Sequence, residues 1–408
     1  MLKIRSIFSI IAFSGGFYGF YILLFILCIA GLAFNSRLFT IPYRAGFMVF
    51  SLIFLVYKMI SKCSFTRLGP LWIPLLTFWF LYFLQIAKDA YFDPVYLGIP
   101  PIEYIQKSIG IAFIPMFIFL NRLGENENKW AYRALWITVL GSCLFSLILY
   151  RDALGEGYRQ IRLSNYETID FISTLILSYI GATTVCIAVQ RLTIERSKNN
   201  SRWIYIFYFT FIFVGLMILL LGGTRSAVLV CIAICAIILI MSSIKSNIFK
   251  NLVFVALALF IVASFIFITK KYGAETTRRF NIAIEQLANR PEKAGGGRIQ
   301  KYLDTIHQIL ENPFWGSSLE LKTTNFYPHN HILEAFMATG MLGGISFIIL
   351  VWVACKRCLK MLQYKKEYGW IACLFLVFFL RGLFSGSIIQ DHLWYSMMAV
   401  FAVPIQKR

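Results

Sequence analysis

The chain has 408 residues, with 39 Lys and Arg against 19 Asp and Glu, and a formal net charge of +20. Only 14% of the residues are charged, whereas 59% are hydrophobic and the mean hydropathy is +0.71. A soluble domain has a larger charged fraction and cannot bury so much apolar surface. The composition therefore excludes a disordered chain, a disulfide-stapled domain and a cytosolic nucleic-acid-binding protein, and it indicates a membrane protein.

Apolar stretches long enough to cross a bilayer recur along the whole chain. A bilayer core of about 30 Å requires about 20 apolar residues per helix. Windows that meet this requirement lie at residues 18–34, 43–60, 71–88, 104–120, 133–150, 168–190, 203–222, 225–243, 250–269, 332–354, 370–387 and 391–405. The sequence thus predicts an all-α polytopic membrane protein, with residues 1–408 forming a single transmembrane domain of about twelve helices.

Lys and Arg in short loops predict the orientation, because such loops stay on the cytoplasmic side of the membrane. With the N-terminus in the cytoplasm, more than half of the 39 basic residues fall in cytoplasmic segments, and both termini are expected inside. Residues 151–162 run against this trend, because they place Arg151, Arg159 and Arg162 outside.

One outside segment, residues 270–331 between predicted helices nine and ten, is far longer than the usual connection of about 2 to 8 residues. Within it, apolar residues recur at helical spacing between Gly295-Gly296-Gly297 and Asn312-Pro313, namely Ile299, Tyr302, Leu303, Ile306 and Leu310. This pattern predicts an amphipathic helix that lies along the membrane surface or caps the bundle.

Unusual charged residues also gather on the outside. Arg225 lies between two apolar runs of about 20 residues, where a charge costs on the order of 2.5 to 3.5 kcal/mol, which favours a function over simple snorkelling. His329 lies where the long loop re-enters the membrane, and a neutral imidazole there could act as a general base or simply as a hydrogen-bonding group. Guanidinium groups bind phosphate through paired hydrogen bonds, so this set predicts a site for a phosphate-bearing lipid. No Asp-x-Asp motif or carboxylate cluster occurs outside, so we expect neither a metal nor a cofactor.

Four motifs in order resemble the O-antigen ligase and polymerase family of bacterial membrane glycosyltransferases. They are Arg162-Leu-Ser, Leu221-Gly-Gly-Thr-Arg225-Ser-Ala, Gly297-Arg298-Ile-Gln-Lys-Tyr followed by Glu311-Asn-Pro-Phe-Trp-Gly316, and Pro328-His329-Asn330-His331-Ile-Leu-Glu334 followed by Gly340-Met-Leu-Gly343-Gly344. The resemblance covers residues 160–350 best and the topology over most of the chain.

This resemblance implies a fold of the multispan lipid-linked-sugar glycosyltransferase (GT-C-like) class in the bacterial inner membrane. It implies metal-independent transfer of a glycan from undecaprenyl diphosphate to an acceptor sugar hydroxyl at the periplasmic face, with membrane lipids and other polysaccharide-assembly proteins as partners and no nucleic acid. By the same resemblance, the catalytic residues are His329, Arg225 and Arg298, the diphosphate-binding residues are Arg162, Arg225, Arg298 and Arg159, and the supporting residues are Asn330 and Glu334. Some members carry Asn-Pro after Arg-Leu-Ser, whereas this chain has Asn165-Tyr-Glu-Thr-Ile-Asp170, so Arg162 matches the family least closely.

Several functions stay open. Residue usage favours an O-antigen polymerase slightly, which extends a lipid-linked repeat, over a ligase, which attaches polysaccharide to lipid A core. A transporter or flippase would place charges at the bilayer midplane. A peptidoglycan polymerase would need a loop carboxylate, for which Asp304 or Glu311 could serve.

The remaining charged and sulfur-bearing residues have structural interpretations. Arg381 is expected to form an ion pair with Glu334 or Asp391, and Lys107 is expected to snorkel. His331 is expected to be peripheral, because neighbours in a helix point in different directions. The Cys355-Lys-Arg-Cys358 spacing has no second pair or histidine ligand and is interpreted as incidental.

Overall fold

The computed structural model describes residues 2–23, 36–61, 68–92, 97–149, 174–195, 202–243, 282, 285, 298–389 and 391–404. Within these residues the chain is helical, and the sole β interaction is an isolated antiparallel bridge between Leu321 and Phe326. The predicted all-α fold is therefore confirmed.

The long helices are α1 (Leu2–Phe17), α3 (Ser36–Ile60), α4 (Trp72–Ala87), α7 (Glu125–Leu149), α9 (Thr174–Glu195), α10 (Arg202–Leu221), α11 (Arg225–Ser243), α14 (Arg298–Glu311), α15 (His331–Tyr364), α16 (Gly369–Gly382) and α17 (Asp391–Ala402). Shorter turns extend or join them: η1 (Gly69–Leu71), η2 (Lys88–Phe92), α5 (Pro101–Ile105), η3 (Gln106–Phe113), α6 (Ile114–Met116), η4 (Phe117–Leu120) and η8 (Lys366–Tyr368).

Eight helical stretches in the described part of the chain are long and apolar enough to cross a membrane. They are Thr40–Ile60, Gly69–Phe92, Pro101–Leu120, Glu125–Ile148, Leu175–Thr193, Trp203–Leu221, Arg225–Ser242 and His331–Tyr364. Each corresponds to a predicted window, and together they make this a multi-pass membrane protein. The predicted window 250–269 lies outside the described residues.

Several predicted windows differ from the structure at their ends. Helix α1 spans Leu2–Phe17 and so precedes the predicted window 18–34, most of which lies outside the described residues. Helix α16 ends at Gly382, before the expected residue 387, since the chain turns through Gly386 with a φ of 102°. Helix α17 ends at Ala402.

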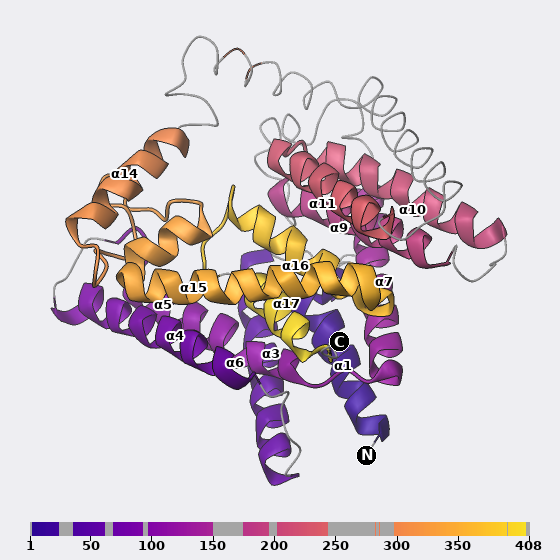
Figure 1. Ribbon diagram of the computed structural model, residues 1–408, viewed down its shortest axis with the longest axis horizontal. Coiled ribbons are helices and arrows are strands. Elements are labelled where there is room, and N and C mark those ends of the chain that lie inside the picture. The colour runs from indigo at the N-terminus through magenta and orange to yellow at the C-terminus, as the bar shows by residue number, and fades with distance from the viewer. Residues whose placement is uncertain are drawn as a thin grey trace.

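The helices pack in two groups, which Figure 1 shows from one side. Helix α15 lies along α4, while α9 packs between α10 and α11. In the group formed by α9, α10 and α11, a Cβ atom on Gly181 would lie 2.5 Å from the Gly215 carbonyl oxygen. The small residues therefore let α9 and α10 approach closely. Close approach of this kind stabilises helix pairs in lipid, where burial of apolar surface supplies little driving force.

An aromatic core joins α4, α15 and α17. The ring of Trp394 lies 4.8 Å from that of Trp79 and 5.3 Å from that of Phe78, and Phe347 completes the group at 5.9 Å. All four side chains are almost fully buried. Rings at these separations add edge and offset contacts to ordinary packing, and they hold α17 against the α4–α15 pair.

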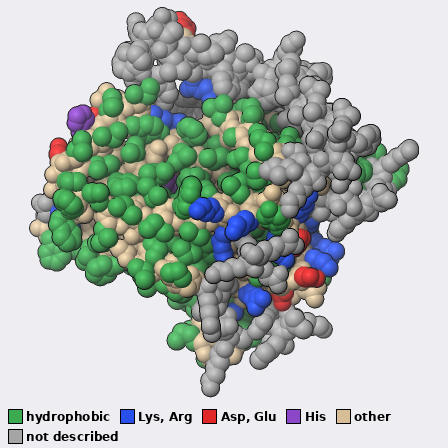
Figure 2. Space-filling view, in the orientation of Figure 1, with side chains coloured by type: hydrophobic (Ala, Val, Ile, Leu, Met, Phe, Trp, Pro, Cys, Tyr) green, Lys and Arg blue, Asp and Glu red, His purple; other side chains and the backbone are tan. Residues whose placement is uncertain are grey.

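The bundle has two ends with different contacts. At one end, hereafter the His329 end, the Tyr302 hydroxyl of α14 donates to the Leu383 carbonyl after α16. At the other, hereafter the Tyr368 end, the Tyr368 hydroxyl donates to the Leu123 carbonyl and the Trp370 indole donates to Asn128. Hydrophobic side chains cover most of the face over α4 and α15, and Lys and Arg gather towards the end of α15 that lies opposite α14 (Figures 1 and 2).

Helix α15 is broken at Gly340, whose backbone has φ 63° and ψ −167°. The chain before α15 fills the break: the Met341 N–H donates to the Pro313 carbonyl at 2.7 Å, and the Ser317 N–H donates to the Met337 carbonyl at 2.8 Å. Irregular backbone at membrane depth is tolerated where protein groups satisfy it in this way. The break therefore docks the loop that leads to His329.

Candidate functional site

The site is built on residues 312–330, hereafter the anchored loop, which connect α14 to α15. Buried polar side chains hold this loop against α4. The Asp89 carboxylate accepts from the Leu319 N–H at 2.7 Å, and the Gln85 amide donates to Asp89 at 2.7 Å and to the Ser317 carbonyl at 3.0 Å. A buried carboxylate is retained only when such donors satisfy it, so these contacts specify the position of the loop.

Glu320 is the second anchor and is 1% exposed. Its carboxylate accepts from the Gly98 N–H at 2.6 Å and from the Tyr104 hydroxyl at 2.7 Å. On the α14 side, the Gln308 amide donates to the Ser318 hydroxyl at 2.8 Å and to the Glu320 carbonyl at 3.0 Å. The anchored loop is thus tied both to α5 and to α14.

The helix predicted within the long outside segment is confirmed as α14. Its buried residues are the polar Thr305 and Gln308, which face the protein. Its apolar side chains are exposed instead: Ile299 by 40%, Leu303 by 48%, Ile306 by 43% and Leu310 by 68%. Polar side chains towards the protein and apolar side chains outward are typical of a helix whose apolar side faces lipid. Contact of α14 with the membrane surface therefore remains a prediction.

His329 lies at the end of the anchored loop in a strained conformation. Its φ of 63° is in the left-handed region, which is uncommon for a residue other than glycine and costs roughly 1–3 kcal/mol. Its ring lies 4.7 Å from that of Tyr327 and 5.3 Å from that of Phe326. Its Nδ1 atom is buried with no hydrogen-bond partner among the described residues. The loop therefore holds the imidazole in one orientation with a nitrogen still available.

Burial and nearby cations keep the imidazole of His329 neutral. Burial is the largest cause and, together with the positive charges of Lys301 and Arg298, it lowers the pKa of His329 to about 4. The Lys301 ammonium lies 5.3 Å from the centre of the Phe326 ring, beside the histidine. Arg298, the first residue of α14, is half-buried. The structure thus brings the predicted Arg298 and His329 into one electrostatic environment and adds Lys301 to it.

The predicted supporting residues contribute to the fold of the site. The Asn330 side chain caps α15 by accepting from the Ile332 and Leu333 N–H groups at 3.0 and 3.1 Å. The fully buried Glu334 carboxylate accepts from the Ser387 hydroxyl and from the Ile388 N–H. Both contacts orient the start of α15 directly after His329.

Arg225 is the first residue of α11 and follows a turn in which Gly223 has a φ of 62°. The Thr224 N–H in this turn donates to the Ser178 hydroxyl at 3.2 Å, which joins the turn to α9. One residue after Arg225, Ser226 accepts from the Tyr179 hydroxyl at 3.4 Å. The half-buried Arg225 therefore lies at the start of α11, between two residues that contact α9.

The prediction that Arg381 pairs with Glu334 was wrong, whereas its pairing with Asp391 stays a prediction. In the described part of the chain no ion pair joins it to Glu334, because the Glu334 carboxylate accepts from Ser387 and Ile388, and the side chain of Asp391 lies outside the described residues. The Arg381 guanidinium lies 5.2 Å from the centre of the Tyr179 ring, and its Nε is buried with no hydrogen-bond partner described. Arg381 is therefore a further cation at the His329 end, in addition to Arg298 and Lys301. A charged residue within an apolar helix was the signal that could have indicated this role.

Other predicted residues have different outcomes. Arg159 and Arg162, like most of the long outside segment before α14, lie outside the described residues. His331 is fully buried against α16, since a Cβ atom on Gly382 would lie 1.9 Å from its Nδ1 atom, so it is not peripheral. Lys107 forms an ion pair with Glu103 at 2.6 Å.

The two carboxylates considered for a peptidoglycan polymerase have local partners. Asp304 accepts from Gln300 at 2.7 Å and from Thr323 at 3.2 Å. Glu311 pairs with Lys322 at 3.3 Å, and both of these side chains are at least 50% exposed. Neither faces a described cavity, so this part of the structure supplies no support for that alternative.

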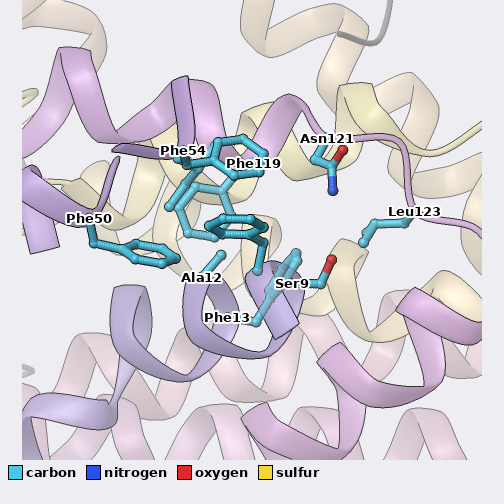
Figure 3. Close-up of a pocket in the computed structure, with 10 residues that line it drawn as sticks. Ser9, Ala12, Phe13, Phe50, Phe54, Phe119, Asn121 and Leu123 are labelled. Carbon is cyan, nitrogen blue, oxygen red and sulfur yellow. The ribbon is translucent and has the colours of Figure 1, made fainter. Parts of the chain in front are cut away.

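Two further features lie away from His329. A cavity of about 10 Å³ between α1, α3 and η4 is lined mainly by aromatic rings and by Asn121 at the Tyr368 end, and it is too small for a substrate (Figure 3). The thiols of Cys186, Cys231 and Cys235 lie within 4.8 Å of one another inside the bundle. Buried cysteines commonly pack as small apolar residues, and no histidine or carboxylate joins this group in the described part of the chain.

The comparisons with known proteins agree with the motifs. Residues 209–348 match the family model described as O-antigen ligase, and this range contains Arg225, Arg298 and His329. No curated protein and no solved structure matches the chain. Residues 209–348 of this multi-pass membrane protein are therefore similar to the O-antigen ligase family, as the motifs at these three residues indicated.

Proposed function

We propose that this protein transfers a glycan from a lipid-diphosphate donor to an acceptor sugar hydroxyl at the His329 end. Members of its family are ligases and polymerases that act on glycans, so the family supports an enzymatic role in polysaccharide assembly. One observation supports the proposed glycan transfer most directly. His329 is held in a strained conformation, and the charges of Arg298 and Lys301 act on its imidazole.

The cations supply what a diphosphate leaving group needs. When the bond between the sugar anomeric carbon and the diphosphate oxygen breaks, negative charge develops on the diphosphate, and guanidinium groups bind and stabilise it. Arg298 and Arg225 were predicted for this role, and Arg381 adds a third guanidinium whose Nε has no acceptor among the described residues. We assign these three arginines to the diphosphate.

His329 is the proposed general base. The new bond forms between the acceptor hydroxyl oxygen and the anomeric carbon, and the hydroxyl proton passes to the neutral imidazole. A base with a pKa of about 4 is weak near neutral pH, since general bases work best with a pKa near the ambient pH. A bound diphosphate would neutralise the charges of Arg298 and Lys301 and so raise the pKa of His329. In this proposal the donor strengthens the base that acts on the acceptor.

The acceptor and the donor lipid are part of the proposal. Residue usage favoured a polymerase slightly, but the matching family is described as O-antigen ligase, so attachment to lipid A core is supported at least as well. By resemblance we propose an undecaprenyl-diphosphate donor, chemistry that needs no metal, and an inner-membrane protein with its termini in the cytoplasm and its site in the periplasm.

Deletion followed by electrophoresis of the lipopolysaccharide tests the function. Bare core with accumulated lipid-linked polymer would identify a ligase, whereas core with one repeat unit would identify a polymerase. Restoring the gene with Arg225→Ala, with immunoblots of membranes to verify accumulation, should leave the defect unchanged. Unchanged lipopolysaccharide after deletion would contradict both assignments.

A further inference from the structure

Three thiols from two helices converge inside the bundle. The Sγ atoms of Cys186 in α9 and of Cys231 and Cys235 in α11 all lie within 4.8 Å of one another. Cys231 and Cys235 are four residues apart and therefore lie on one face of α11. Each of the three side chains is at most 5% exposed, and none of them forms a disulfide. They make a set of soft, metal-binding ligands that the proposed glycan transfer does not use.

The spacing of these thiols suits a three-coordinate ion. A metal–sulfur bond of about 2.3 Å places the three sulfurs of a trigonal site about 4.0 Å apart, and the observed group lies within 4.8 Å. Small rotations of the side chains therefore bring all three sulfurs into bonding distance. Buried cysteines also occur as simple packing residues. Packing alone, however, does not require three thiols from two helices to face one another.

The ligand set selects the ion. Thiolates favour Cu(I) and Zn(II) among the common metals, and structural zinc sites are almost always four-coordinate. Among the described residues, no histidine, carboxylate or fourth thiol belongs to the group. A further thiol, that of Cys373 in α16, donates to the Cys186 carbonyl at 3.8 Å instead. Cu(I) accepts three sulfur ligands, and loss of one thiol proton offsets its single charge, which keeps a site inside the bilayer neutral.

Further cysteines lead from this group towards the Tyr368 end. Cys373 lies close enough to Cys235 for their charges to interact, and Cys358 of α15 lies as close to both Cys373 and Cys355. Cys358 and Cys373 are fully buried, whereas Cys355 is half-buried. A metal site needs an entry path. This row of thiols offers a soft ion successive ligands from the half-buried Cys355 to the interior.

The three converging thiols lie between helices that also carry residues of the His329 end. Helices α9, α11 and α16 contact one another. On α11, Cys231 follows Arg225 by six residues, which corresponds to about 9 Å along the helix. On α9, Cys186 follows Tyr179 by seven residues. An ion bonded to both helices would therefore fix their spacing one to two turns from the residues that join them at the His329 end.

We propose that the thiols of Cys186, Cys231 and Cys235 bind one Cu(I) ion, which ties α9 to α11. The row of thiols from Cys355 to Cys373 is the route by which the ion enters from the Tyr368 end. The ion is structural and takes no part in the proposed glycan transfer, for which no metal is expected. The inference goes beyond the proposed function and does not depend on it.

Copper binding is measured on the full-length protein in detergent, reduced and free of oxygen. Cu(I) is titrated in competition with bicinchoninate, a chelator that forms a coloured complex with Cu(I), and the bound copper is counted by mass spectrometry of the metal. One Cu(I) per chain is expected to remain bound. X-ray absorption at the copper edge should then show three sulfur ligands. A protein that retains no copper, or a site with only two sulfurs, would overturn the proposal.

Variants locate the ion. Cys186→Ala and Cys231→Ala should each lower the Cu(I) affinity at least about 100-fold, because even a group that only orients a ligand contributes about 10- to 100-fold. Cys143→Ala is the matched control and should bind Cu(I) normally, since Cys143 is equally buried but bonds to Thr184 at 3.0 Å outside the group.

Cu(I) should also raise the Tm of the Cys143→Ala control but not that of Cys186→Ala. Equal copper binding by these two variants would indicate an adventitious ion only and would overturn the site. The sulfur count comes from the unaltered protein, so it still tests the proposal if an alanine variant fails to fold.

Two further measurements test the route and the choice of ion. The double variant Cys355→Ala with Cys358→Ala should slow copper loading at least about tenfold, because an ion without ligands along its path meets a higher barrier in the apolar interior. Its affinity at equilibrium should be unchanged, and unchanged loading would reject the route. Tighter binding of Zn(II) by four sulfurs would overturn the assignment to Cu(I). A protein that binds Cu(I) at these thiols but transfers no glycan would keep the copper site and reject the proposed function.

Discussion

Helix α9 carries two arginine–tyrosine contacts, one towards each end of the bundle, and their difference shows what makes a site. At the His329 end Arg381 lies 5.2 Å from the ring of Tyr179, and at the Tyr368 end Arg191 lies 3.8 Å from the ring of Tyr132. Both arginines are half-buried, and both have an Nε with no partner among the described residues. The local chemistry is therefore nearly the same.

The surroundings of the two contacts differ. Next to Arg191, the Gln190 amide donates to the Lys366 carbonyl, and nearby cations such as Lys58 bind local acceptors. At the Arg381 end, His329 is strained, Lys301 and Arg298 lower its pKa, and Glu334 is already occupied by Ser387 and Ile388. We therefore interpret the arginine–tyrosine contact as a packing element at the Tyr368 end and as part of the proposed anion site at the His329 end.

The largest expected effect distinguishes His329 from another histidine on the same side. His329→Ala should lower the rate of glycan transfer by about 10²- to 10⁴-fold, because a general base contributes that much. His307→Ala, an exposed position of α14, should leave the rate unchanged. Rates are measured with purified protein in vesicles. Equal rates for the two variants would exclude His329 as the base.

The second prediction compares the two arginines directly. Arg381→Ala should lower kcat by about 10²-fold, as the loss of a preorganised donor to a leaving group does. Arg191→Ala removes a similar ring contact at the other end and should leave kcat unchanged at equal thermal stability. If the two variants lose activity together, the cause is packing, and Arg381 has no role in the site.

Third, the broken helix at the His329 end should be sensitive to a single methyl group. A Cβ atom at Gly340 would lie 2.1 Å from the Phe314 carbonyl oxygen, and the φ of 63° disfavours any other residue. Gly340→Ala should lower the free energy of unfolding by at least about 2 kcal/mol. Gly46→Ala meets no atom within 4 Å and should be neutral or stabilising. Thermal unfolding in detergent measures both, and equal Tm values would contradict the observed break.

Fourth, two glutamates in and beside the anchored loop should respond differently to neutralisation. Glu320→Gln places an amide against the Gly98 N–H or the Tyr104 hydroxyl and should cost about 1–3 kcal/mol. Glu311→Gln removes an exposed ion pair with Lys322 and should cost at most about 1 kcal/mol. The Tm in detergent should therefore fall for the first variant and scarcely change for the second.

The smallest effect concerns pH. The pKa of His329 is lowered to about 4, so kcat/KM for the donor should persist as the pH falls and be lost only as it approaches 4. Removing a nearby positive charge makes protonation easier, so Lys301→Gln should raise the pKa of His329 and move this loss to higher pH. In kcat the loss should already occur at higher pH in the wild type, because bound diphosphate neutralises the cations. A pH–rate profile that Lys301→Gln leaves unmoved would contradict the coupling.

Much of the architecture could be predicted because its determinants are local. Eight membrane-spanning stretches follow from runs of apolar residues, and α14 follows from the spacing of Ile299, Leu303 and Ile306. The motifs also predicted Arg298 and His329 as site residues, and the structure places them close enough for the charge of Arg298 to lower the pKa of His329. Helix ends were less predictable, as Gly382 shows, because turns depend on contacts beyond the helix.

The sequence by itself determined that this is a multi-pass membrane protein with cations and a histidine at a loop entering the membrane, since hydropathy and motif order are properties of neighbouring residues. Only the tertiary structure decided that Arg381 lies over Tyr179 instead of pairing with Glu334, that Gly340 breaks α15 to receive the anchored loop, and that the thiol of Cys186 lies beside those of Cys231 and Cys235. These contacts join residues far apart in the chain. The partner of a buried polar group depends on which other groups the packed helices bring next to it. The sequence alone does not give these neighbours.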